Sequence, residues 1–105
     1  MTLKQTASKE TFEQIINNSK IKIEKIISYG DITPEDFWYD QDQDEFVMII
    51  EGFAIIKYED GTIFELHQDD NLYIPAHQKH KVIYTKNRTI WLAMFIKDQE
   101  KKIIH

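Results

Sequence analysis

Two short stretches of the sequence hold most of the side chains that could do chemistry. One is YDQDQDE at residues 39–45, and the other is PAHQKH at residues 75–80. Carboxylates and imidazoles bind divalent transition metals and move protons, whereas amides and phenols are weaker metal ligands that also hydrogen-bond to small molecules. The candidate site residues in these stretches are Tyr39, Gln41, Glu45, His77 and His80. If the fold brings the two stretches together, they form either a metal site or a polar pocket.

The composition excludes several other classes of site. The chain has no cysteine, so disulfides, thiolate nucleophiles and cysteine-bound zinc are impossible. Its formal net charge of −5 is opposite in sign to the clustered positive charge of proteins that bind a nucleic-acid backbone. The sequence contains no nucleophile elbow, P-loop, dinucleotide fingerprint or His-Glu-x-x-His motif. We therefore expect no nucleic-acid partner, and hydrolase, nucleotide and metalloprotease functions have no support.

Length and hydropathy set further expectations. At 105 residues the chain has room for one domain. No apolar run approaches the roughly 18 residues that a membrane-spanning helix needs, so no membrane partner is expected. The first ten residues, MTLKQTASKE, lack the apolar segment of a secretory signal, which makes a cytoplasmic location the expectation.

The first twenty residues are expected to form a short helical segment. Phe12, Ile15 and Ile16 are spaced as on one face of a helix, with polar residues between them, and Ser8 is suited to the N-cap. A helix in this position would cover an end or an edge of a sheet.

The rest of the chain has the pattern of short β-strands. Ile21 and Ile23 alternate with charged residues, which indicates a half-buried strand that ends near Tyr29. Gly52 and Gly61 provide a bend and a hairpin turn further along. Six β-rich runs are separated by turn residues: FVMIIEG, FAIIKYE, TIFELH, NLYIP, KVIYT and TIWLAMFI. Strands at such close and even spacing, without helices between them, indicate a sandwich or a barrel.

Both chemistry-bearing stretches resemble the two sequence motifs of the small single-domain cupins. Glu45 and Gly52, within WYDQDQDEFVMIIEG at residues 38–52, are separated by the six residues expected between the glutamate ligand and the glycine of the first motif. Residues 75–80 match the Pro-x-Gly-x-x-His core of the second motif, with His77 in place of its glycine. The resemblance implies that Glu45 and the last histidine of the second stretch face one pocket.

The resemblance covers most of the chain, from about residue 21 to residue 95. It implies an all-β fold, the cupin double-stranded β-helix or jelly-roll barrel, closed over residues 21–105 and preceded by the helical segment 1–20. Because one-domain cupins are commonly dimers, it also implies a homodimer.

The first motif departs from the cupin pattern in its metal ligands. Cupins carry His-x-His four and six residues before the glutamate, where this chain has Gln41 and Tyr39. One interpretation is a modified site in which Gln41, Glu45 and His80, helped by Tyr39 or His77, hold a divalent transition metal such as Zn, Fe, Ni or Mn. A second is a metal-free pocket in which the same side chains orient a small organic ligand. A third is that Glu45 and His80 only satisfy each other.

Three further side chains are candidates for the wall of the pocket. Trp38 is the first, because it lies next to Tyr39, and Tyr84 and Met94 lie in strand-like runs. Most aromatic residues in such runs belong to the core. His67, at the end of a predicted strand, is expected on the surface.

We therefore expect a small-molecule-binding cupin. One version of it is a metal-dependent enzyme that acts on a small polar metabolite, with Tyr39 as general acid or base. The alternatives are a metal-free ligand-binding or sensory domain without catalysis, and a protein whose chief property is self-association. The resemblance does not decide whether the protein is an enzyme, because cupins include both enzymes and sensors.

Overall fold

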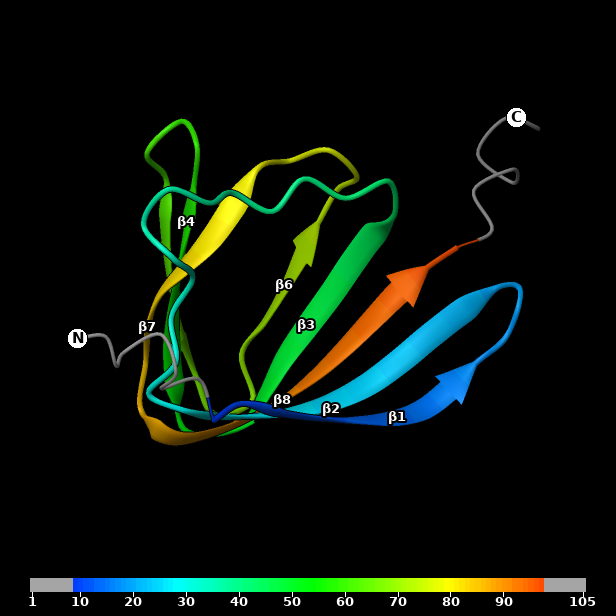
Figure 1. Ribbon diagram of the computed structural model, residues 1–105, viewed down its shortest axis with the longest axis horizontal. Coiled ribbons are helices and arrows are strands. Elements are labelled where there is room, and N and C mark those ends of the chain that lie inside the picture. Colours follow the sequence, from blue (N-terminus) through cyan, green and yellow to red (C-terminus); the bar gives the residue numbers. More distant parts are fainter. Residues whose placement is uncertain (1–8, 98–105) are drawn as a thin grey trace.

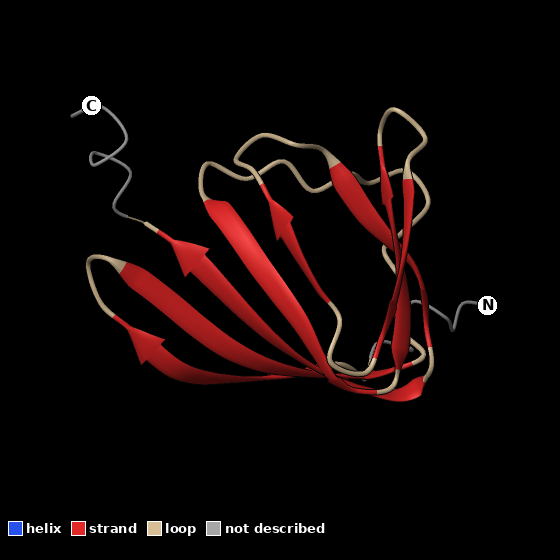
Figure 2. Cartoon of the chain, turned by 180° about the vertical axis from the view of Figure 1, so that it is seen from behind, coloured by secondary structure: helices blue, strands red, loops and turns tan. Residues whose placement is uncertain are grey.

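A computed structural model describes residues 9–97 (Figures 1 and 2). The regular secondary structure in this range consists of β-strands, without a helix. Within this range no helix is long and apolar enough to cross a membrane. The eight strands are β1 (Thr11–Asn17), β2 (Ile21–Tyr29), β3 (Asp44–Glu51), β4 (Phe53–Tyr58), β5 (Ile63–His67), β6 (Asn71–Ile74), β7 (His80–Thr85) and β8 (Asn87–Ile96). The strand predicted to end near Tyr29 and the six later β-rich runs are all confirmed.

The strands form two antiparallel sheets that face each other. One sheet has five strands in the order β1-β2-β8-β3-β6, and the other has three in the order β5-β4-β7. Figure 1 shows the sheets meeting at one end and diverging towards the other, with β1 and β2 farthest from the three-stranded sheet. The all-β prediction is confirmed. The closed barrel is not found among the described residues, because the sheets pack through side chains and no hydrogen-bonded ladder joins β1 to β7.

The predicted N-terminal helix is wrong over residues 11–17, which form β1 and pair with β2. A β-bulge at Ile15 explains the misleading spacing, since the register shifts between Gln14 and Ile16. An extra residue in a strand moves all later side chains to the opposite face. Phe12 therefore faces the other sheet, whereas Ile16 faces away from it, and the spacing of three and four imitates a helix. Ser8 lies outside the described residues.

The core lies between the two sheets. It is a cluster of buried apolar side chains: Val47, Ile49, Ala54, Ile56, Leu66, Ile74, Trp91 and Ala93. A buried polar chain continues from it, in which the Trp91 indole donates a hydrogen bond to Ser28 Oγ (3.0 Å) and Ser28 donates to Glu10 Oε2 (2.6 Å). These bonds hold the residues before β1 against the interior, where an unpaired indole N–H would be costly.

Candidate functional site

A cavity of about 150 Å³ lies between the sheets. Its apolar wall consists of Phe12, Ile26, Val47, Ile56, Ile74, Val82, Trp91 and Phe95. Its polar lining consists of Glu10, Glu24, Tyr39, Gln41, Glu45 and His80. The volume is below the roughly 300 Å³ at which drug-sized pockets begin, so the cavity suits a small molecule. Mostly apolar walls with a few convergent polar groups are typical of ligand sites.

Backbone pairing brings the two chemistry-bearing stretches together. Tyr39 and His80 form an isolated antiparallel bridge, with N–H to carbonyl distances of 2.8 and 3.1 Å, and their rings stack with centroids 5.6 Å apart. Glu45 lies at the start of β3, where it pairs with Ile74 of β6 just before the second stretch begins. The predicted convergence of Tyr39, Gln41, Glu45 and His80 on one pocket is therefore what the structure displays.

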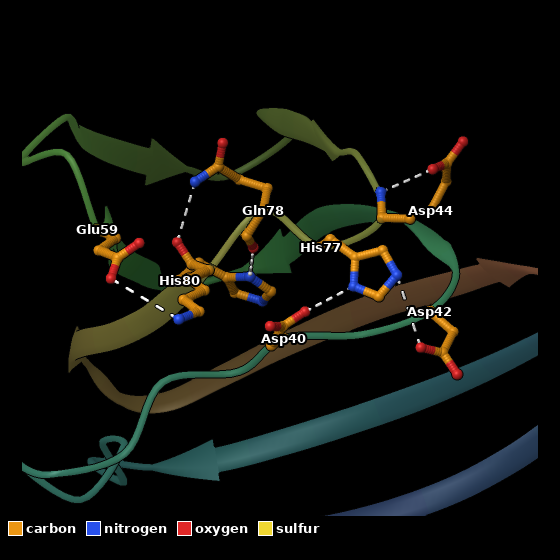
Figure 3. Close-up of polar contacts among 9 residues, drawn as sticks. Asp40, Asp42, Asp44, Glu59, His77, Gln78 and His80 are labelled. Carbon is orange, nitrogen blue, oxygen red and sulfur yellow. Dashed lines mark hydrogen bonds and ion pairs between the residues drawn. The ribbon is translucent and has the colours of Figure 1, made fainter.

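Glu45 and His80 face each other at the buried end of this cavity. Their exposed fractions are 9% and 5%, and Glu45 Oε1 lies 3.7 Å from His80 Nε2. The distance is too long for a direct hydrogen bond but allows one ligand atom to bridge the two groups. His80 Nδ1 lies 2.8 Å from the carbonyl oxygen of Gln78 (Figure 3). A carbonyl oxygen can only accept, so Nδ1 carries the proton, and Nε2 presents its lone pair to Glu45.

Burial shifts the pKa values of both groups towards their neutral forms. It raises the pKa of Glu45 to about 7, and the Glu24 carboxylate adds to this effect while the Lys22 ammonium opposes it. Desolvation lowers the pKa of His80, against a weaker opposing effect of the Gln78 carbonyl. Burial is also the main reason that the pKa of Tyr39 is raised, with the Glu10 carboxylate as the next cause. At neutral pH the site therefore offers an uncharged imidazole, a phenol that donates, and a carboxyl group near its midpoint.

His77 does not line the cavity. Its side chain is 64% exposed, with Nδ1 2.8 Å from Asp40 Oδ1 and Nε2 3.7 Å from Asp42 Oδ1 (Figure 3). Its backbone N–H donates to the carbonyl of Gln41 (2.7 Å). It has a φ of 65°, the left-handed conformation for which glycine is best suited. His77 thus ties the loop before β3 to the turn before β7.

Asp44, the first residue of β3, fixes the same turn. One carboxylate oxygen accepts the N–H of Ala76 (2.8 Å), and the other accepts the hydroxyl of Tyr73. The residue is 2% exposed, so these hydrogen bonds compensate the cost of a buried carboxylate.

Residues 26–95 match the family model described as a cupin domain, which is well over half of the chain. This protein is a cupin. Its β-strands and the placement of Glu45 and His80 agree with the resemblance of the two motifs. Cupins commonly bind transition metals and small molecules, so the family bears on what this cavity could hold, while fold alone does not name the ligand.

Solved structures agree with the assignment to the cupins. A protein from Ralstonia eutropha JMP134, provisionally named mannose-6-phosphate isomerase, is 39% identical, with 83% of each chain covered and a TM-score of 0.79. A cupin superfamily protein from Desulfitobacterium hafniense DCB-2 is 20% identical over 86% of this chain and 79% of that one, with a TM-score of 0.75. An RmlC-like cupin from Shewanella frigidimarina NCIMB 400 is 18% identical over 89% and 80%, with a TM-score of 0.73. The last two support the fold alone. A comparison with the curated proteins gives no match.

The cupin metal pattern is only partly represented. Among residues 9–97 no group of three or more His, Cys, Asp or Glu side chains is arranged to hold a metal ion. Glu45 and His80 are strong potential ligands, and Gln41 and Tyr39 stand where the family has histidines. A neutral amide and a phenol that keeps its proton are poor replacements for two imidazoles. The donor set therefore fits a transition metal incompletely.

Three predicted wall residues lie outside the cavity of this cupin. Met94 lies between Ala93 and Phe95, which face the interior, so strand alternation turns it outward. Tyr84 follows a bulge in β7, which moves it to the outer face, where it is 47% exposed. Trp38 lies under the ammonium of Lys81, whose Nζ is 4.4 Å from the ring centroid.

Two carboxylates in the cavity were missed by the sequence reasoning. Glu24 lies on the inward side of β2 with Ile26, so the charged side of the alternating run faces the other sheet. Glu10 comes from the segment expected to be helical. The sequence did contain a signal for the inward position of Glu24. In a regular strand, residues 24, 26 and 28 lie on one face, and Ile26 and Ser28 are an apolar and a small residue suited to the interior.

Proposed function

We propose that this cupin binds a small polar organic molecule in the cavity between its sheets, with Glu45 and His80 as the main contacts. The observation that carries the proposal is the pair itself, because both side chains are buried and oriented towards each other 3.7 Å apart at the wall of an apolar cavity. A ligand with a donor and an acceptor would complete the hydrogen bonding of both groups.

Tyr39 is the candidate for a catalytic role. Its pKa is raised, so its hydroxyl remains protonated at neutral pH and would act as a donor or general acid towards the ligand. It lines the cavity and has 40% of its surface exposed, which leaves it accessible to an incoming molecule. Its stacking against His80 fixes the ring next to the buried pair.

A divalent transition metal, Zn, Fe, Ni or Mn, is the second candidate occupant. The orientation of His80 favours it, because Nδ1 is anchored on the Gln78 carbonyl and Nε2 is directed towards Glu45, as in many metal-binding histidines. Glu45, His80 and Gln41 would then hold the ion. Because two of the expected imidazoles are replaced, we expect weak binding and place the metal-free ligand first.

Elemental analysis and thermal unfolding separate the two candidates. We expect protein purified without chelators to contain far less than one transition-metal ion per chain. In a metabolite panel, a ligand at one hundred times its Kd should stabilise the native state by about 2.7 kcal/mol, which raises Tm by roughly 10 °C or more. Glu45→Gln and His80→Ala should abolish that rise.

The matched controls are the exposed Glu65→Gln and His67→Ala variants, which should keep the ligand response. One metal ion per chain, lost in both site variants and retained in both controls, would replace the first candidate by the second. A ligand response that survives both site variants would contradict the proposed cavity.

We also propose that the protein is a homodimer formed through the outer face of the five-stranded sheet. The strand register places one apolar side chain from each strand in a continuous row on that face: Ile16, Ile23, Met94, Phe46 and Tyr73. Ile16 is 41% exposed and Tyr73 is 47% exposed. Exposed apolar rows of this kind are typical of protein interfaces.

Light scattering tests the dimer. We expect the wild type to have twice the mass of one chain and Ile16→Glu to have the mass of one, because a charge in the row opposes burial of that face. Ile63→Glu is the control, since Ile63 is 46% exposed on the other sheet. A monomeric wild type, or loss of the dimer in the control as well, would contradict this interface.

A further inference from the structure

We propose that the ligand of this cavity is a small organic cation, a primary amine with an apolar body, whose ammonium group lies against Glu45. This inference rests on the proposed function, because it names the charge of the molecule that the cavity would hold.

The cavity lining is acidic, with three carboxylates against one histidine. Three carboxylates line it, on Glu10, Glu24 and Glu45, and no lysine or arginine of residues 9–97 is among the lining side chains. The remaining basic side chain of the lining is a histidine, His80, whose Nδ1 is already engaged by the Gln78 carbonyl. A small acidic site enclosed by apolar walls attracts cations and repels anions, because the low dielectric strengthens both effects.

Glu45 has no hydrogen-bond donor within the described part of the chain. It is 9% exposed, its Oε1 lies 3.7 Å from His80 Nε2, and it lines the cavity. By contrast, Glu10 already accepts the hydroxyl of Ser28. No side-chain oxygen of the described residues is both fully buried and unpaired, so the Glu45 carboxylate reaches the cavity, where an ammonium group would supply the opposite charge and up to three donors. Glu45 is therefore the anchor that the ligand should occupy.

The chain's own lysine illustrates how such a cation would be held. Lys22 Nζ lies 3.6 Å from Glu24 Oε2 and 4.8 Å from the centroid of the Phe95 ring. Glu24 and Phe95 both line the cavity, so a carboxylate and an aromatic face already hold one ammonium at its border. Lys22 offsets one of the three carboxylates, which leaves Glu10 and Glu45 to set the sign of the site.

A phosphorylated sugar is the ligand that the name of the protein from Ralstonia eutropha would suggest. A phosphate in this cavity would lie among carboxylates, with neither an arginine nor a lysine among the described lining residues. Phosphate sites use such basic groups or backbone N–H groups at helix N-termini, and residues 9–97 contain no helix. The charge of the lining thus disfavours an anionic substrate for this chain.

Three four-carbon probes of different charge, together with a sugar phosphate, test the inference by NMR. The probes are butylamine, 1-butanol, butyrate and mannose 6-phosphate at pH 8, in metal-free buffer. The two tryptophans of the chain provide the readout, because the indole of Trp91 lines the cavity and that of Trp38 does not. We expect the amine to shift the Trp91 indole signal with a Kd at least about tenfold lower than that of butyrate, and to leave Trp38 unchanged.

Single substitutions identify the carboxylate that is responsible for the preference for a cation. Glu45→Gln should raise the Kd of butylamine by about tenfold, which corresponds to the loss of one charge-assisted hydrogen bond, and should leave that of 1-butanol unchanged. Glu24→Gln should have a smaller effect because Lys22 already pairs with that carboxylate. Glu65→Gln, on the exposed side of β5, is the control and should have none.

The outcomes separate this inference from the proposed function. If butyrate or mannose 6-phosphate shifts Trp91 at lower concentration than butylamine, the cavity binds ligands but the inferred charge is wrong. If all four probes leave Trp91 unshifted, both the inferred cation and the proposed pocket fail. If Glu45→Gln and Glu65→Gln weaken the amine equally, Glu45 is not the anchor.

Discussion

Gly52→Ala should destabilise the protein by at least about 3 kcal/mol, a large fraction of the stability of a domain of this size. Gly52 has a φ of +108° at the corner where the chain passes from β3 in one sheet to β4 in the other. A Cβ there would lie 2.6 Å from Thr89 Oγ1, 2.8 Å from Thr89 Cα and 2.9 Å from the carbonyl oxygen of Arg88. Two of these atoms are backbone, so the corner itself would have to move.

The same displacement would break the hydrogen bonds that close the corner. Thr89 Oγ1 accepts the N–H of Phe53 (3.3 Å), and its own proton faces the carbonyl oxygens of Lys86 (2.7 Å) and Phe53 (3.1 Å). Thr89 is completely buried, so the Phe53 N–H that it caps would lose its acceptor, while its hydroxyl keeps the Lys86 carbonyl as a partner. Urea unfolding at neutral pH measures the loss, and a drop in Tm of more than about 10 °C should accompany it.

Gly61→Ala is the matched control for this experiment. Gly61 has a similar φ of +97° in the hairpin between β4 and β5, but a Cβ there would meet no atom within 4 Å. Its cost should therefore be the backbone strain alone, about 1 to 2 kcal/mol. If the two variants lose the same stability, the close packing of Gly52 against Thr89 does not stabilise the corner as we infer.

The spacing of residues in the sequence was sufficient to predict the centre of the site. Glu45, Gly52 and His80 occupy positions of the two cupin motifs. A motif predicts which side chains lie together because its spacing includes the turn residues that set the strand positions. The strands were predictable as well, since alternation and turn residues are local properties of the chain. The sequence favoured His80 over His77; His80 lines the cavity, whereas His77 lies in the turn and contacts the aspartates of the facing loop.

Bulges account for much of what the sequence could not predict. The extra residue at Ile15 made β1 look helical, and the extra residue at Ile83 turned Tyr84 away from the cavity. Each bulge depends on the partner strand, because the same residues in a regular ladder would keep their alternation. Single-strand periodicity carries no information about the partner, so both errors have one physical origin.

The inward carboxylates could not be predicted for a different reason. Hydrophobic patterning assigns the apolar side of an alternating strand to the interior, and that rule fails where the interior contains a polar cavity. In β2 the isoleucines at positions 21 and 23 face outward and Glu24 faces the cavity. A charged side chain on the inward face of β2 is expected if the cavity is functional, because proteins depart from hydrophobic patterning most often at functional sites.

The stability of the protein should fall as the pH rises because of Glu45. Its pKa is about 7 in the folded state, whereas an exposed glutamate has an ordinary pKa of 4.5, so the folded state holds the proton more tightly. Between these values the folded protein binds more protons than the unfolded chain, and the free energy of unfolding therefore decreases with increasing pH. Over the full interval the decrease amounts to about 3 kcal/mol.

His80 acts in the opposite direction within part of this range. Its pKa is lowered from 6.5, so below pH 6.5 the unfolded chain binds more protons and stability rises with pH. The contribution of Glu45 is therefore best measured as the difference between wild type and Glu45→Gln. Urea unfolding of both proteins from pH 4 to pH 8 gives that difference at each pH.

We expect the two proteins to be nearly equal in stability at pH 4, where Glu45 is neutral, and the variant to be more stable by about 3 kcal/mol at pH 8. Glu65→Gln, which removes an exposed carboxylate, should follow the wild-type curve. Parallel curves for wild type and Glu45→Gln would show that the folded protein does not disfavour the ionised form. A buried carboxylate that destabilises its own fold near neutral pH, and that a neutral isostere could replace, is expected where a bound ligand provides the missing charge or donors. The pH profile of the free protein and the charge preference of the cavity are thus two consequences of the same unpaired group.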